Sequence, residues 1–311
     1  MQIKNFAISS ILFISLFSCK KEESQKEVVS PQWNTTTEFP GVGRQNAVTF
    51  SIGSKGYLGL GNGDLEVVYS DLWEFDSDNK IWNKKSDFPG TPRAAPTSFT
   101  INNIGYVVNG ACNCSDFWQY DPSLNKWTRK ADFPIAGLYY SAAFVLDGKA
   151  YVGTGTNGGE LQNQIWEYDP SLDEWTRKAD FPGVAMDDAL GFSIAGKGYF
   201  ATGNQSLTVS NALWQYDPSS DLWIRKADFP VETFGSVGFS LNNKAYIGLG
   251  FAGSEFWEYD PIYDTWRQTA NFTSGGRTGA KAFIINNKAF VGLGTSSYTV
   301  YPKDMWQFSI D

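Results

Sequence analysis

Three arginines at equivalent positions are the residues of this sequence best suited to binding an anion. Arg44, Arg93 and Arg277 each lie six residues before a phenylalanine that recurs along the chain. A guanidinium group forms charge-assisted hydrogen bonds with carboxylates and phosphates. Three such cations converging on one pore are expected to hold an anionic group. The alternative is that these arginines tie neighbouring loops together, because buried arginine is often structural.

The other candidate residues are acidic or aromatic and lie in segments that connect predicted strands. Asp187 and Asp188 are adjacent, which suits Ca²⁺ binding or acid–base chemistry, and a solvated loop pair is the alternative. We expect one ligand-binding face to gather the following residues around the arginines: Tyr139, Tyr140, Glu160, Asp187, Asp188 and Glu232, with Asp64, Glu66, Phe234 and Tyr298 nearby.

The composition excludes several kinds of chemistry. The chain of 311 residues contains no histidine, so Ser-His-Asp catalysis, Cys-His catalysis and imidazole-bound zinc or copper are absent. Lys and Arg number 25 against 33 Asp and Glu, which gives a net charge of -8. Without a basic surplus, a nucleic acid is not an expected partner.

Two of the three cysteines form a Cys-x-Cys pair. For Cys112 and Cys114, a disulfide and two free thiols are both compatible with the spacing. A soft-metal site would need further ligands, and the chain has no histidine and only three methionines to offer. We therefore expect neither a metal nor a cofactor.

The elements that position these residues belong to an internal repeat. Two series of tryptophans recur at intervals of 43 to 49 residues, and members of the second series follow those of the first by nine residues. A phenylalanine follows each second-series tryptophan by six residues, and we expect both residue types to pack between neighbouring units. The first series is Trp73, Trp118, Trp166, Trp214, Trp257 and Trp306, and the second is Trp82, Trp127, Trp175, Trp223 and Trp266.

Each repeat has the pattern of four strands. An alternating strand leads through a tight turn, such as 147–148, into an apolar strand that ends on glycine, such as 57–61. A third strand, such as Phe-Trp-Glu-Tyr-Asp at 256–260, is followed by a turn of the Asp-Pro-Ser type and by the fourth strand. Four strands per period indicate a blade of a β-propeller. The loops from second to third strand vary in length, and binding is expected at such loops.

The glycine-ended second strand, the Tyr-Asp-Pro and the downstream tryptophan resemble the kelch repeat, in six copies. The resemblance implies an all-β, six-bladed kelch-type propeller with four antiparallel strands per blade. Six-bladed kelch rings include bacterial sialic-acid mutarotases. The kelch-type copper oxidases are excluded, because their metal site needs histidine.

The two ends of the repeat predict how the ring closes. The last unit stops after Trp306 and lacks a fourth strand, whereas Trp33 belongs to a fourth strand that no other strands precede. An open ring would leave unpaired strand edges. We therefore expect the segment around Trp33 to pair with the C-terminal strand, giving a 3+1 closure and one domain over residues 31–311.

The N-terminal residues predict the cellular location of the protein. Residues 1–19 read as a signal peptide whose apolar run ends at Cys19, which resembles the lipobox of bacterial lipoproteins and implies an acylated cysteine. Ordinary cleavage with Cys19 unmodified is the alternative. Residues 20–30 are expected to form a charged tether, and 20–24 resemble the export signal of Bacteroidota surface lipoproteins. The expected location is the outer membrane of the cell envelope, and the resemblance of residues 20–24 to an export signal implies exposure on the cell surface.

These observations favour a binding or interaction module over an enzyme. We expect an envelope-anchored monomer that holds a glycan or a protein at the variable-loop face, and that meets the membrane only through its lipid. The alternative function is a mutarotase or epimerase for an acidic sugar such as sialic acid. A purely structural role in an envelope assembly is a third possibility. No residue can be assigned a catalytic role from the sequence.

Overall fold

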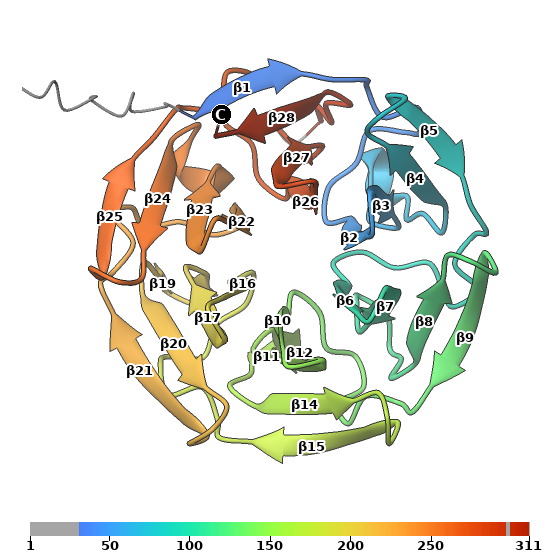
Figure 1. The fold of residues 1–311 in the computed structure, drawn as a ribbon. Coiled ribbons are helices and arrows are strands. Elements are labelled where there is room, and N and C mark those ends of the chain that lie inside the picture. Colours follow the sequence, from blue (N-terminus) through green and yellow to red (C-terminus); the bar gives the residue numbers. More distant parts are fainter. Residues whose placement is uncertain (1–30, 297–298, 311) are drawn as a thin grey trace, which may run out of the picture.

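The computed structural model describes residues 31–296 and 299–310, and these form six four-stranded antiparallel sheets around a central channel (Figure 1). The all-β, six-bladed prediction is therefore confirmed. The predicted signal peptide, Cys19, the tether and Tyr298 lie outside the described residues.

In five blades the four strands follow one another along the chain, and in the sixth the outermost strand comes from the N-terminal segment (Figure 1). In each blade the strand given first below lies innermost. Blades 1 and 2 contain β2 (Val48–Ile52), β3 (Lys55–Gly59), β4 (Leu72–Asp76) and β5 (Ile81–Lys84), then β6 (Thr97–Ile101), β7 (Ile104–Val108), β8 (Phe117–Asp121) and β9 (Lys126–Lys130). Blades 3 and 4 contain β10 (Ala142–Leu146), β11 (Lys149–Gly153), β14 (Ile165–Asp169) and β15 (Glu174–Lys178), then β16 (Leu190–Ile194), β17 (Lys197–Ala201), β20 (Leu213–Asp217) and β21 (Leu222–Lys226). Blades 5 and 6 contain β22 (Val237–Leu241), β23 (Lys244–Gly248), β24 (Phe256–Asp260) and β25 (Thr265–Gln268), then β26 (Lys281–Ile285), β27 (Lys288–Gly292), β28 (Met305–Ser309) and β1 (Gln32–Thr35).

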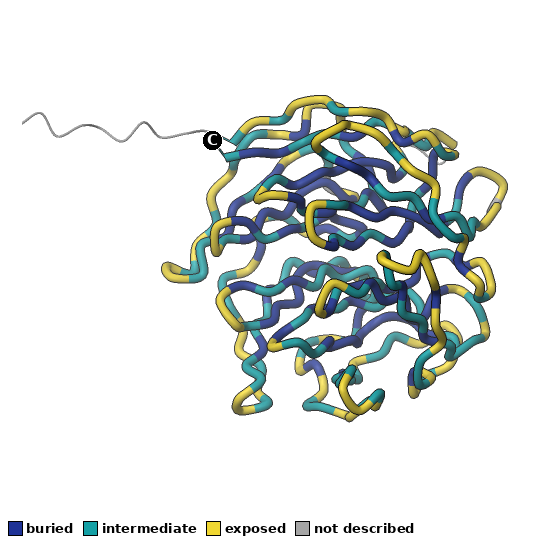
Figure 2. The backbone as a smooth tube through the Cα atoms, turned by 45° about the vertical axis from the view of Figure 1, so that its right-hand side comes forward, coloured by how far each residue is buried: buried dark blue, intermediate teal, exposed yellow. Residues whose placement is uncertain are grey.

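The inner strands alternate because their two faces have different neighbours. In β2, the side chains of Val48 and Phe50 are buried between blades, whereas Thr49 lines the channel. Second strands such as β3 are buried almost throughout, because both of their faces meet a neighbouring blade. Figure 2 shows the result, with buried backbone inside each blade and exposed backbone at the turns and loops.

The chain closes as the sequence predicts. Strand β1 pairs antiparallel with β28, so that Trp33 lies opposite Phe308 at the outer edge of blade 6 (Figure 1). The Trp33 ring lies 4.9 Å, between centroids, from the rings of Phe256, Phe272 and Phe308. Its indole N–H donates to the carbonyl of Ala270, 3.0 Å away. The first strand therefore joins the last two blades.

The second tryptophan series connects neighbouring blades, as predicted. Trp127 of blade 2 lies edge-on to Phe88 of the blade 1–2 connection, with 5.2 Å between ring centroids. Its indole N–H donates to the carbonyl of Ser86 at 3.0 Å. The same donation to the preceding blade recurs in all six blades, from Trp33, Trp82, Trp127, Trp175, Trp223 and Trp266. These indole bonds and ring contacts hold the outer circumference of the propeller.

The loops between second and third strands carry the remaining short elements. These are the hairpins β12 (Thr156–Asn157) with β13 (Glu160–Leu161) and β18 (Asn204–Gln205) with β19 (Thr208–Val209), and the 3-10 turns η1 (Asp64–Glu66) and η2 (Gly250–Ala252). No helix within the described part of the chain is long and apolar enough to span a membrane.

Candidate functional site

The three arginines are buried inside the loop layer. Each guanidinium binds an aspartate of its own blade and also donates to a backbone carbonyl sixteen residues further along the chain. The N–O distance is 2.8 Å from Arg93 to Asp116 and 2.6 Å from Arg277 to Asp304, and Arg44 binds Asp71 in the same way.

These contacts match the alternative role for the arginines, in which they tie loops together. Each aspartate also accepts a hydrogen bond from the indole two residues later, as Trp118 donates to Asp116 at 2.6 Å. The Arg93 guanidinium lies 5.0 Å from the centroid of the Phe88 ring. Because these charges are neutralised and enclosed, the arginine trio is not part of the candidate site.

A ring of six residues forms the mouth of the channel, and we call it the mouth ring. Each member lies four residues before the recurring phenylalanine of its first strand, and each has a φ between 50° and 64°, in the left-handed region. Backbone hydrogen bonds join successive members, as from Asp188 N–H to the Tyr140 carbonyl at 3.0 Å and from Gly279 N–H to the Gly235 carbonyl at 3.0 Å. The members are Asn46, Ala95, Tyr140, Asp188, Gly235 and Gly279.

The side chains of the mouth ring are unevenly distributed. The Tyr140 hydroxyl reaches past Ala95 and accepts a hydrogen bond from the Asn46 amide at 3.1 Å. The Asp188 carboxylate points the other way, since its Oδ2 lies 3.2 Å from the position that a Cβ on Gly235 would occupy. Bulky residues in the left-handed region are uncommon, but all six members of the mouth ring share this conformation, so the repeat imposes the φ of 55° on Tyr140.

A cavity of about 230 Å³ lies beneath the mouth ring. It is lined by small and hydroxyl-bearing residues at the start of the first strands, such as Ser98 and Ser141, and by Lys281. Among its lining residues in the described chain, Lys281 is the charged one. A second cavity of about 360 Å³ shares Thr49 and Gly191 with the first, so the channel continues along the axis.

Burial perturbs the titrating groups at this mouth. It raises the pKa of Asp188 from 3.8 to about 6, with the Lys281 charge opposing the rise and the Asp187 charge adding to it. Burial also lowers the pKa of Lys281, an effect that the Asp188 charge opposes. The pKa of Tyr140 is raised to about 12 by burial and by the two aspartates. Perturbed acids and bases around one cavity are typical of functional sites.

A second layer supports the mouth from the adjacent loops. Asp187 accepts hydrogen bonds from the Thr156 hydroxyl and from the Asn204 amide, the latter at 3.1 Å. Isolated β-bridges join Tyr139 to Thr156 and Asp187 to Asn204. The segment before a first strand and the loop after the second strand of the same blade therefore lie on this face. The Tyr139 ring lies 5.5 Å from the Tyr140 ring. The structure therefore brings Tyr139, Tyr140, Asp187 and Asp188 together, as expected.

Other predicted members of the face stand apart from this cluster. Glu160 in β13 and Glu232 before β22 are exposed, and none of the contacts described for the chain links either to the mouth. Asp64 is also exposed, and it caps its own loop by accepting the Leu65 N–H at 2.9 Å.

Two features of the site have a signal in the sequence that becomes visible when the repeats are compared position by position. Lys281 lies two residues before its recurring phenylalanine, where the other five repeats carry Val48, Thr97, Ala142, Leu190 and Val237. The aspartate partners occur two residues before the first-series tryptophan in the three arginine-containing repeats, whereas the others carry Gln164, Ala212 and Glu255. Aligning the repeats column by column would have identified both.

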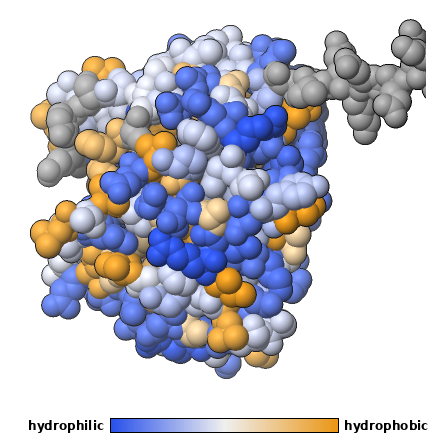
Figure 3. Space-filling view, turned by 90° about the vertical axis from the view of Figure 1, so that its left-hand side faces the viewer, coloured by the Kyte–Doolittle hydropathy of each residue, from blue (hydrophilic) through white to orange (hydrophobic). Residues whose placement is uncertain are grey.

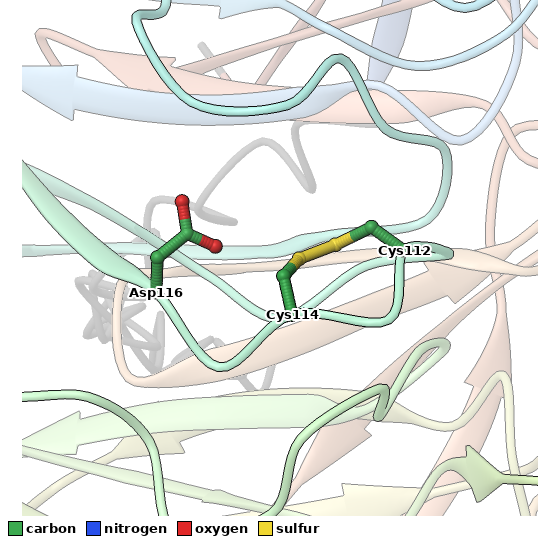
Figure 4. Close-up of side chains that lie close together, drawn as sticks. All are labelled: Cys112, Cys114 and Asp116. Carbon is green, nitrogen blue, oxygen red and sulfur yellow. A yellow bond between two sulfur atoms is a disulfide. The ribbon is translucent and has the colours of Figure 1, made fainter.

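Cys112 and Cys114 are joined in a disulfide in the loop between β7 and β8. Figure 4 shows the Asp116 carboxylate beside it, and the three side chains place their ligand atoms within 4.8 Å of one another. The sulfurs are bonded to each other, and Asp116 is bound by Arg93 and Trp118. We therefore assign this cluster to the structure of the loop.

The pKa of Asp188 should depend on Lys281 in a defined direction. In a ¹³C-carboxyl NMR titration, we expect an apparent pKa of about 6 in the wild-type protein and a higher value in Lys281→Met, because the lysine charge lowers it. The control Lys288→Met makes the same change in β27, at the far end of the same hairpin, and should leave Asp188 unchanged. A value near 3.8 in both proteins would contradict this description of the mouth.

The architecture defines the class of this protein, a six-bladed β-propeller. No protein-family model matches the sequence, and neither does any curated protein. Because 799 solved chains match the fold, it identifies no activity by itself. One of them, titled "Structure of YjhT", has a TM-score of 0.73 and 18% identity, and the match covers 87% of this chain and 96% of that one. At this identity the likeness shows the fold alone.

Proposed function

We propose that this chain is a ligand-binding propeller of the kelch type, and that the mouth of its channel binds an acidic unit of a glycan. The observation that carries the proposal is the placement of Lys281 in the wall of the cavity beneath the mouth and of Asp188 in the mouth ring above it. The half-buried Lys281 ammonium can form a charge-assisted hydrogen bond with a ligand carboxylate. The Asp188 carboxyl, when protonated, can donate a hydrogen bond to the same ligand.

The remaining groups at the mouth suit a sugar. Tyr139 and Tyr140 offer ring faces and hydroxyls, and the cavity wall offers the hydroxyls and backbone of Ser98 and Ser141. Sites with a few fixed polar groups on a largely preformed surface are typical of small-ligand binding. Because the mouth ring is fixed by backbone hydrogen bonds, these groups need little rearrangement to bind.

The proposed location follows from the N-terminal sequence. Acylation at Cys19 would anchor the propeller to the bacterial outer membrane, and residues 20–30 would act as a tether. A monomer with its variable-loop face accessible would then meet glycans outside the membrane. Metabolic labelling with a palmitate analogue tests this part, since Cys19→Ser should abolish labelling.

Calorimetric titration with N-acetylneuraminic acid, glucuronic acid and glucose tests the binding site. We expect the two acidic sugars to bind more tightly than glucose, and Lys281→Met to weaken them by about tenfold or more, which corresponds to about 1.4 kcal/mol. Lys288→Met should bind like the wild-type protein. Equal binding by the wild-type and Lys281→Met proteins would exclude Lys281 from the site.

The affinity for an acidic sugar should fall as the pH rises through about 6. Below this pH the Asp188 carboxyl is neutral and donates a hydrogen bond, and above it the carboxylate repels the ligand carboxylate. Asp187, Tyr140 and Lys281 face the same space, and the effect should disappear in Asp188→Asn. An affinity that does not change between pH 5 and 8 would show that Asp188 does not face the ligand.

Mutarotation of an acidic sugar is a second candidate, favoured by the opposite pKa shifts of Asp188 and Lys281. The Asp188 carboxylate would take the proton of the anomeric hydroxyl while the Lys281 ammonium gives a proton to the ring oxygen. The bond from the anomeric carbon to the ring oxygen breaks, and a carbonyl forms. Reversal on the other face restores both protons. Exchange NMR should then show faster anomer interconversion, lost in Asp188→Asn, and an unchanged rate would exclude this activity.

A further inference from the structure

A stacked aromatic pair, with one exposed ring and one half-buried ring, lies next to the channel mouth, and the mouth chemistry does not use it. The rings of Phe234 and Phe251 stack with 5.4 Å between centroids and 15° between planes. Phe251 is 70% exposed, although it is a large apolar side chain. An exposed ring that is already held parallel to a second ring presents a flat, preformed surface to a ligand.

Backbone hydrogen bonds fix the pair in place. The Phe251 N–H donates to the Phe234 carbonyl at 3.1 Å, which joins the two loops of blade 5. The neighbouring Gly250 N–H donates to the Arg277 carbonyl at 2.8 Å, and this bond connects η2 to blade 6. Arg277 is itself held by Asp304. The aromatic surface is therefore part of the rigid loop layer.

The pair borders a cavity of about 410 Å³, larger than the one beneath the mouth ring. Three glycines contribute to its wall, and a Cβ on Gly253 would meet nothing within 4 Å, so backbone groups are accessible there. The hydroxyl-bearing residues Thr278 and Ser296 also line it. An aromatic face combined with surrounding hydroxyls suits a pyranose ring, which has an apolar C–H face and a polar rim.

Two residues that line this cavity are next in sequence to members of the mouth ring. Phe234 precedes Gly235, a member of the mouth ring. Asp188 Oδ2 lies 3.2 Å from the position that a Cβ on Gly235 would occupy. Thr278 precedes the next member, Gly279, whose N–H donates to the Gly235 carbonyl. A ligand unit stacked on Phe251 would therefore be adjacent to a unit held at Asp188 and Lys281.

We propose that Phe234 and Phe251 form a second subsite, which stacks a neutral pyranose linked to the acidic unit at the mouth. This inference rests on the proposed function and makes the natural ligand an acidic oligosaccharide instead of a free sugar. The neutral unit lies on Phe251, and its hydroxyls are bound by the rim of Thr278, Ser296 and glycine backbone.

The surroundings of Phe251 favour a sugar over a protein partner. The side view of Figure 3, which faces the blades at the left of Figure 1, shows hydrophilic side chains over most of the middle and separate hydrophobic patches toward the margins. Tyr263 is the other exposed aromatic side chain among the described residues, at 75% exposure, and it has no stacked ring partner there. Phe251 is thus distinguished by its fixed ring partner and its hydroxyl-lined cavity.

Paired titrations of the full-length protein with sialyllactose and N-acetylneuraminic acid test the subsite. We expect the wild-type protein to bind the trisaccharide about tenfold more tightly than the monosaccharide, as one stacked ring typically contributes. Phe251→Ala should remove this difference and leave monosaccharide binding unchanged, whereas Phe251→Trp should retain it. Leu207→Ala, at an equally exposed loop tip of blade 4, is the control and should bind both sugars normally.

The outcomes separate the two proposals. If both sugars bind with equal affinity and Phe251→Ala changes neither, the subsite is wrong and the mouth proposal stands. If the wild-type protein binds neither sugar, the proposed function is wrong and the subsite falls with it. If Phe251→Ala instead abolishes capture of a protein and leaves both sugars unaffected, the surface is a protein interface and the subsite is overturned.

Discussion

Replacing Arg93 by methionine is expected to lower the free energy of unfolding by about 3–5 kcal/mol, the largest effect of any single substitution considered. The guanidinium is fully buried and binds both Asp116 and the Asn109 carbonyl. Its removal leaves a carboxylate in the loop layer without its cation. Urea denaturation of the wild-type and Arg93→Met proteins measures the difference, provided that the m-values agree.

An exposed ion pair of the same blade provides the matched control. Arg129 and Asp132 lie 2.8 Å apart at the surface, and Arg129→Met should change the stability by less than about 1 kcal/mol. The double variant Arg93→Met/Asp116→Asn should recover part of the loss, because it removes the unpaired charge as well. If Arg93→Met were as stable as Arg129→Met, the arginine would not tie the loops together and would be available for a ligand.

Replacing Trp33 by alanine should lower the free energy of unfolding by about 3 kcal/mol, the second largest effect. This side chain contacts Phe256, Phe272 and Phe308 and donates to the Ala270 carbonyl, so its loss opens the outer edge where the chain closes. Trp33→Phe keeps most of the ring contacts and should cost less.

A variant at the neighbouring Gln32 is the control for Trp33→Ala, because it shows what removing an exposed side chain from β1 does to stability. Gln32 lies in the same strand and faces solvent, so Gln32→Ala should change the stability by no more than about 0.5 kcal/mol. Thermal or urea denaturation of both variants measures the comparison. Equal stabilities for Trp33→Ala and Gln32→Ala would contradict a closure that depends on the packing of β1.

The fold was predictable from the sequence because it follows from repetition. Each tryptophan performs the same packing in every blade, so its interval alone indicates the number of blades. The pairing of β1 with β28 follows from Trp33 lacking its own preceding strands, since an unpaired edge is unfavourable. None of these inferences needs a particular side-chain conformation.

The candidate site was only partly predictable, because it depends on contacts between different repeats. The position of Arg93 was clear, but its partner Asp116 lies in another part of the blade, and this pairing turns a potential anion site into a buried ion pair. The left-handed backbone at Tyr140, shared with Asp188, has no signature in the tyrosine itself, because asparagine, aspartate or glycine is typical of that conformation. The fold imposes this conformation, and it directs both side chains to the mouth.

Lys281 was missed because sequence patterns average over the repeats. The equivalent position in the other first strands is usually apolar, as at Val48 and Val237. A lysine at one of six such positions does not by itself indicate a function. Only the closed ring brings it near Asp188, which belongs to another blade more than ninety residues away. Electrostatic coupling across a channel therefore requires the three-dimensional arrangement.

A crystal structure of the protein with bound N-acetylneuraminic acid tests the central claim most directly, with binding in solution measured alongside. We predict the sugar at the mouth ring, with its carboxylate within hydrogen-bond distance of Lys281 Nζ and with Asp188 and Tyr140 in contact. The buried arginines should keep their aspartate partners. A sugar bound to Arg44, Arg93 or Arg277 with the ion pair broken, or bound only at the opposite end of the channel, would contradict the account.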